Sequence, residues 1–191
     1  MPHPAIPSLV LVPGDDMHDP DALFAVATAY AHSGLVISRY ANENDQMAFA
    51  FPAIVCSSFA LELFLKFFLM MNLVERGEIS QNVCFGHTIP TLWNEVTPVH
   101  KALIAGMFQN STGEPYTAGV EIRLQVFEDA LRNLGNQPFV QWRYVHELRS
   151  PQLMSHGAIS IVVDALGHAA EYIVKRARTQ RKTGDNASHA D

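Results

Sequence analysis

The 191-residue chain can form one domain with a continuous apolar core, because 48% of its residues are hydrophobic and only 17% are charged. Its net charge of −6 is not that of a general phosphate-binding surface, although a local basic patch is compatible with this total. The chain has two cysteines, Cys56 and Cys84, which cannot form the disulfide framework of a small secreted domain. We therefore expect a reduced, cytoplasmic protein.

The N-terminal residues 1–19 are predicted to form an irregular arm, because prolines interrupt them repeatedly. They lack the basic stretch that opens a secretory signal peptide. Asp19 followed by Pro20 is typical of a helix start, with the acid as N-cap and the proline in the first turn. A helix is predicted over 21–42, where alanines and Gly34 would let a neighbouring helix approach closely.

The stretch 51–74 is apolar on almost every face, yet it carries Glu62 and Lys66 in its middle. A helix that is apolar all round belongs at the centre of a bundle. A membrane-spanning helix also needs roughly 20 apolar residues, but two central charges would be costly in lipid. We expect a buried core helix, no second stretch of this kind and no membrane partner.

The remaining chain shows helical periodicity in several further segments and no sustained strand pattern. An all-α, up-and-down bundle of about five helices with short extra helices is therefore predicted. We expect a single domain over 20–180 and a disordered tail over 181–191. The further helices are predicted over 89–96, 98–108, 120–134, 139–148 and 155–178.

Glu62 and Lys66 lie one helical turn apart, so their side chains can pair on one face of the core helix. A buried carboxylate must be paired or neutralised, and we expect Arg143 to be its second partner, because a guanidinium can bind it with two donors. Two interpretations remain open for this group: an ion pair that fixes the helix register, and an active-site acid. The first is favoured.

The segment 139–147 combines aromatic and ionisable residues. On a helix, Arg143, His146 and Glu147 would share one face. His146 can titrate near neutral pH and could act as a general acid or base. The alternative is a partly exposed histidine with an ordinary hydrogen bond.

Three motifs, in this order and spacing, resemble those of bacterial HEPN-like helical-bundle proteins. They are the core motif from Glu62 to Lys66, the Gly86-His87 turn and the F..WRY..E pattern over 139–147. The resemblance covers roughly 47–147 and implies a bundle of about five helices. It also implies frequent homodimers, and some members are metal-independent ribonucleases or toxins while others are inactive. In this interpretation a polar network is formed by Glu62, Lys66, His87, Arg143, Tyr144 and Glu147.

Ribonucleases of this group carry Arg-x(4–6)-His at the start of their last long helix. Arg149 and His156 match this count, whereas Arg143 and His146 lie too close together. Pro151 and two apolar residues between Arg149 and His156 depart from the pattern. In such a site the histidine activates the ribose 2′-hydroxyl and the arginine stabilises charge on the phosphorus. The candidate catalytic residues are therefore Arg149, His156, Arg143 and His146.

Other patterns point to surfaces rather than sites. Asp164, His168 and Glu171 share a helix face at a spacing that could hold a metal, but we expect a solvated or interface face there. The basic residues from Lys175 to Lys182 fit the C-terminal end of a helix. No phosphate-binding glycine loop or paired-cysteine motif is present, so no cofactor or metal is expected.

Two functions from different classes follow. One is an RNA- or nucleotide-linked stress or defence role, with metal-independent ribonuclease action by a homodimer. The alternative is a non-catalytic interaction or scaffold module in which the buried network is structural.

Overall fold

The computed structural model describes residues 20–78, 86–112, 119–144 and 155–188, and these residues form helices without any strand. The prediction of an all-α fold is confirmed. A 3₁₀ turn, η1, covers Met47–Phe49 and leads into the second helix. The helices are α1 (Pro20–Glu43), α2 (Ala50–Glu75), α3 (Ile89–Glu95), α4 (Pro98–Thr112), α5 (Val120–Asn133), α6 (Pro138–Arg143) and α7 (His156–Ser188).

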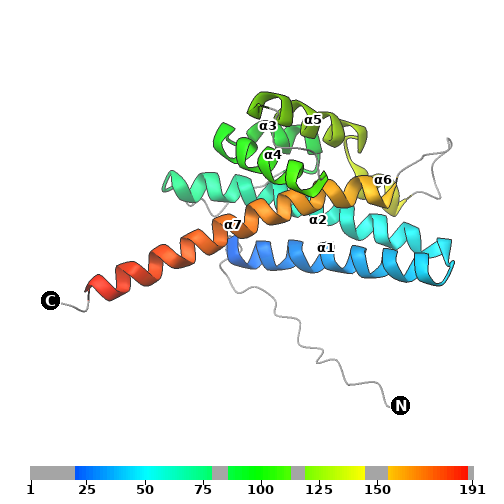
Figure 1. Ribbon diagram of the computed structural model, residues 1–191, viewed down its shortest axis with the longest axis horizontal. Coiled ribbons are helices and arrows are strands. Elements are labelled where there is room, and N and C mark those ends of the chain that lie inside the picture. The colour runs from blue at the N-terminus through cyan, green and yellow to red at the C-terminus, as the bar shows by residue number, and fades with distance from the viewer. Residues whose placement is uncertain (1–19, 79–85, 113–118, 145–154, 189–191) are drawn as a thin grey trace, which may run out of the picture.

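Helix α2 is the core of the bundle, with α1, α7, α6 and α3 packed against it, while α4 packs mainly on α7 and α5 on α4 (Figure 1). Its large side chains Leu61, Phe64, Leu65, Phe67 and Phe68 are almost completely buried. They point in different directions around the helix, and an all-round apolar helix can be kept from water only by neighbours on every side. The predicted central position of this segment is confirmed.

Helix α1 lies along one edge of the bundle, where it packs against α2 and α7 (Figure 1). Its inward face is made of small residues, with Ala27, Gly34 and Ala41 buried. A Cβ atom at Gly34 would overlap the Ser57 hydroxyl and lie 3.0 Å from the carbonyl oxygen of Ala53. The lack of a side chain at Gly34 therefore sets how closely α1 and α2 approach.

The outward face of α1 keeps several large apolar side chains in contact with solvent. These are Val26, Tyr30, Val36 and Tyr40, which are 38–49% exposed. We call this set the α1 apolar face. A single helix at the edge of a bundle has only one side covered, so its other side needs another partner or remains in water.

Three helical segments of the described chain are long and apolar enough to cross a membrane by length and composition alone. They are Pro20–Glu43, Met47–Glu75 and His156–Thr179, whose most apolar windows are 11%, 56% and 44% buried in the protein. The expectation that only the core segment qualifies is therefore wrong. Alanines raise the mean hydropathy of the first and third segments, although polar residues share these helices.

Most helix boundaries lie within two residues of the predicted ones, but α4 runs four residues past its predicted end and α6 ends at Arg143, five residues before the predicted end at 148. A third difference lies at the C-terminal end. Helix α7 continues to Ser188, into the range expected to be a tail, and its last part projects beyond the bundle (Figure 1). The segment contains no proline, so the backbone can continue the helix without losing a hydrogen bond. The expected N-terminal arm, residues 1–19, lies outside the described residues.

Candidate functional site

An open cavity of about 410 Å³ lies between α1, α2 and α7. This volume is within the usual range of small-molecule sites, roughly 300–1,000 Å³. Its apolar part includes Phe24 and Phe64, and its polar part combines hydroxyl, imidazole and carboxylate groups. The polar lining residues are Thr28, His32, Ser57, Ser160, Asp164, Glu171, His156 and His168.

His156 and Ser57 meet in this cavity from two helices that are far apart in the sequence. The Ser57 Oγ and His156 Nε2 atoms are 3.1 Å apart, within hydrogen-bonding distance. Ser57 is buried in the middle of α2, and His156 is the first residue of α7. Gly34 of α1 packs closely against Ser57, so the hydroxyl group has little room to adopt another rotamer.

Burial in the cavity shifts the pKa values of His156 and Asp164 towards each other. Burial lowers the pKa of His156, and Asp164 partly opposes this shift. Burial raises the pKa of Asp164, and His168 and His156 partly oppose that shift, although the Asp164 side chain stays open to solvent at the cavity edge. His156 is therefore a neutral imidazole at physiological pH, the form that can accept a proton.

The polar residues of α7 recur at helical intervals along one face, in the order His156, Ser160, Asp164, His168 and Glu171. Three of these were expected on a solvated or interface face, but the structure shows that they line the cavity. In the described part of the chain, no group of three His, Cys, Asp or Glu side chains is arranged to hold a metal ion. Glu171 is paired instead with Lys175, at 2.7 Å.

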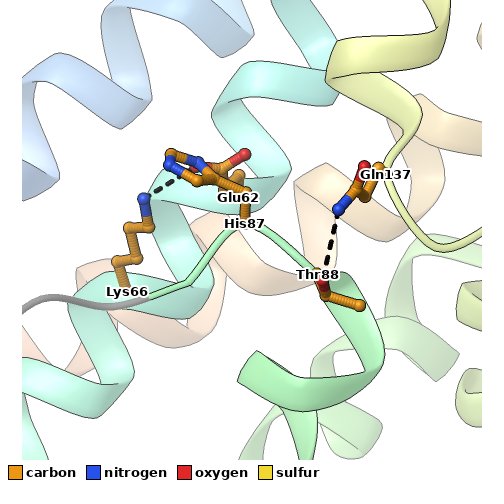
Figure 2. Close-up of polar contacts among 5 residues, drawn as sticks. All are labelled: Glu62, Lys66, His87, Thr88 and Gln137. Atoms are coloured by element: carbon orange, nitrogen blue, oxygen red, sulfur yellow. Dashed lines mark hydrogen bonds and ion pairs between the residues drawn. The ribbon is translucent and has the colours of Figure 1, made fainter.

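The buried carboxylate of Glu62 is paired as the sequence required, but with a different second partner. Its Oε1 atom accepts hydrogen bonds from Lys66 Nζ and from His87 Nδ1, each at 2.7 Å (Figure 2). Next to His87, the Thr88 hydroxyl accepts a hydrogen bond from Gln137 Nε2 at 3.3 Å (Figure 2). These contacts join α2 to the start of α3 and to the turn before α6.

Arg143 does not reach Glu62. Its guanidinium lies over two aromatic rings, 5.0 Å from the ring centre of Phe139 and 4.6 Å from that of Tyr144. Helix α6 ends at Arg143, and both Arg143 and Tyr144 are exposed to solvent. The expected contact between Arg143 and Glu62 was wrong, because His87 and not a residue of α6 is the second partner of the Glu62 carboxylate.

The structure describes only some of the remaining candidate residues. His146, Glu147 and Arg149 lie outside the described residues. Of the four candidate catalytic residues, the structure therefore places His156 in the cavity and Arg143 among aromatic rings. Sequence reasoning missed Ser57, His32 and Thr28. The four-residue spacing on α7 indicated its polar face. No pattern in α1 or α2 indicated that Ser57, His32 and Thr28 lie opposite that face.

Comparison of the chain with protein-family models, with curated proteins and with solved structures finds no match.

Proposed function

We propose that the cavity between α1, α2 and α7 cleaves RNA or a related ribonucleotide without a metal ion, with His156 as the general base. The observation that carries the proposal is the position of His156. It begins the last long helix, lies in a cavity of substrate size and has its pKa lowered by burial. The HEPN-like motifs support the same assignment, because they place a catalytic histidine at the start of the last helix.

The proposed step is a transfer within the ribonucleotide. His156 takes the proton of the ribose 2′-hydroxyl, and the 2′-oxygen attacks the adjacent phosphorus. A 2′,3′-cyclic phosphate forms while the bond from phosphorus to the 5′-oxygen breaks, and that oxygen leaves with a proton. In the tautomer in which Nε2–H of His156 donates to Ser57 Oγ, Nδ1 is the free base, so we assign proton abstraction to Nδ1. Asp164, two turns further along the same face of α7, is the candidate proton donor, because burial raises its pKa.

The lining also restricts the substrate. Glu171, further along α7, repels phosphate, and its ion pair with Lys175 weakens this repulsion. The phosphate to be cleaved must therefore lie at the His156 end of the cavity, with few further phosphates along α7. Short single-stranded RNA or a nucleotide satisfies this requirement better than a duplex.

The test is to incubate the purified protein with total RNA and with a short defined oligonucleotide in the presence of a chelator. Wild type should produce 2′,3′-cyclic phosphate ends, and His156→Asn should lower the rate roughly 10²- to 10⁴-fold, the usual contribution of a general base. His87→Ala is the matched control, because His87 lies outside the cavity lining. Arg149→Ala, His146→Ala and Arg143→Ala complete the set of predicted catalytic residues.

The proposal is wrong if folded wild type cleaves no RNA at any concentration, or if folded His156→Asn cleaves as fast as wild type. Circular dichroism and thermal unfolding of each variant separate a lost activity from a lost fold.

We also propose that two copies pair through the α1 apolar face in the cytoplasm, without a membrane. The face has Val36 and Tyr40 towards one end and Val26 and Tyr30 towards the other, where the exposed alanines Ala25 and Ala29 lie beside them. In an antiparallel pair about a two-fold axis, the first end of one copy would pack on the second end of the other, where the alanines leave room. Val36→Asp should convert the dimer to a monomer in light scattering. Recovery only with detergent-solubilised membranes would contradict this proposal.

A non-catalytic interaction module is the second candidate. The α1 apolar face favours it, because an exposed apolar surface of this kind often marks a protein-binding site. In that case Val36→Asp abolishes partner binding, whereas His156→Asn changes nothing.

A further inference from the structure

An aromatic cluster away from the cavity lining connects α1, α2 and α6. The rings of Tyr30 and Phe59 meet edge to face at 4.6 Å, and Phe59 stacks on Phe139, also at 4.6 Å. Arg143 lies over Phe139 and over Tyr144. The first two contacts link α1 to α2 and α2 to α6, and the Arg143 contacts continue along α6 to its C-cap. Five side chains therefore form a continuous row: Tyr30, Phe59, Phe139, Arg143 and Tyr144.

This row ends at the protein surface. Tyr144 is 42% exposed, Tyr30 is 38% exposed, and the Arg143 side chain is open to solvent. Phe51, at the start of α2, is 48% exposed and lies 6.4 Å from Trp142 of α6. Apolar side chains of this size are usually buried in a monomer, so an exposed group of them indicates a binding surface.

Arg143 gives this surface a charge as well as rings. Its flat guanidinium packs against aromatic faces, and among the described residues it has no ion pair with a carboxylate. Both ring contacts engage the flat face of the guanidinium, and the Arg143 side chain is exposed to solvent. A planar, positively charged group beside exposed rings matches two parts of one ligand: a base that stacks on the rings and a phosphate that binds the arginine.

We infer that Arg143 and Tyr144 form a stacking platform for the unpaired bases of single-stranded RNA. A duplex hides its base faces, whereas a single strand presents them together with its phosphates. The aromatic row that ends in this platform shares one turn of α2 with the cavity, because Phe59 belongs to the row and Ser57 to the cavity lining. This inference rests on the proposed function and names its substrate: a single strand held by α6 and cleaved at His156.

The test measures binding apart from cleavage. A fluorescent single-stranded oligonucleotide with 2′-O-methyl riboses has no free 2′-hydroxyl, so it can bind but cannot be cleaved by the proposed step. Fluorescence anisotropy should show binding of this strand by wild type and much weaker binding of its duplex. Tyr144→Ala and Arg143→Ala should each weaken binding roughly 5- to 150-fold, the range of one lost base stack.

Two conservative variants and one control sharpen the result. Tyr144→Phe should bind like wild type, because it keeps the ring, and Arg143→Lys should bind more weakly than wild type, because it loses the flat stacking group. Tyr172→Ala is the control, since Tyr172 is 49% exposed on α7 and lies outside both the aromatic row and the cavity lining. It should leave binding unchanged, and the melting temperature of each variant verifies its fold.

The inference is overturned if folded wild type does not bind the strand, which would leave the surface to a protein partner. It is also overturned if folded Tyr144→Ala and Arg143→Ala bind the strand as wild type does, or if the duplex binds equally well. Cleavage that depends on His156, with unchanged binding by Tyr144→Ala, removes the platform but keeps the proposed function. Binding that depends on Tyr144, without cleavage of natural RNA, keeps the platform and removes the ribonuclease proposal.

Discussion

Replacing Gly34 with alanine tests whether the crossing of α1 and α2 limits the packing of the bundle. The added Cβ would overlap the Ser57 Oγ atom, which can rotate away only by giving up its contact with His156. It would also lie 3.0 Å from the carbonyl oxygen of Ala53 and 3.2 Å from the amide nitrogen of Ser57. These two atoms belong to the α2 backbone, so the helices themselves must move apart.

The expected change is the difference between two opposing terms. Overpacking a tight contact costs about 1–3 kcal/mol. Alanine in a helix is about 0.5–1 kcal/mol more favourable than glycine. Gly34→Ala should therefore lower the free energy of unfolding by up to about 2.5 kcal/mol, or the melting temperature by up to about 10 °C for a chain of this size.

Gly106→Ala is the matched control, because Gly106 lies within α4 and a Cβ there would meet no atom within 4 Å. It should raise the free energy of unfolding by about 0.5–1 kcal/mol. Urea and thermal unfolding of both variants give the two values. If Gly34→Ala stabilises the protein as much as Gly106→Ala does, the α1–α2 contact is not close and the geometry described for Ser57 is wrong.

Two further predictions concern buried ionisable groups. Glu62→Leu should cost about 3–5 kcal/mol of unfolding free energy, because it leaves the mostly buried Lys66 amine without its partner. The double variant Glu62→Leu with Lys66→Met should recover most of this loss. A double variant that is no more stable in urea than Glu62→Leu alone would contradict this prediction. Burial lowers the pKa of His156 and of His100 in the folded state, so the unfolded chain binds more protons, and stability should fall as the pH drops from about 6.5 through the lowered pKa values. His156→Asn and His100→Gln should each flatten this slope in denaturation curves between pH 7 and 5, and an unchanged slope in both would show that other groups cause it.

The sequence by itself determined the elements of this protein. Helical periodicity gave the all-α class, and proline, asparagine and glycine positions gave most helix ends to within a few residues. The pairing of Glu62 with Lys66 was also predictable, because residues four apart on a helix are neighbours whatever surrounds them. The central place of α2 followed from its apolar surface alone.

Only the tertiary structure decided which helix faces meet. It gave Glu62 the His87 side chain in place of Arg143, and it brought Ser57 of α2 to His156 of α7. It also left the outward face of α1 uncovered. Periodicity specifies which residues of one helix share a face. How closely two helices cross depends on the sizes of the residues at their contact, and the absence of a side chain at Gly34 matters only because α2 packs against it.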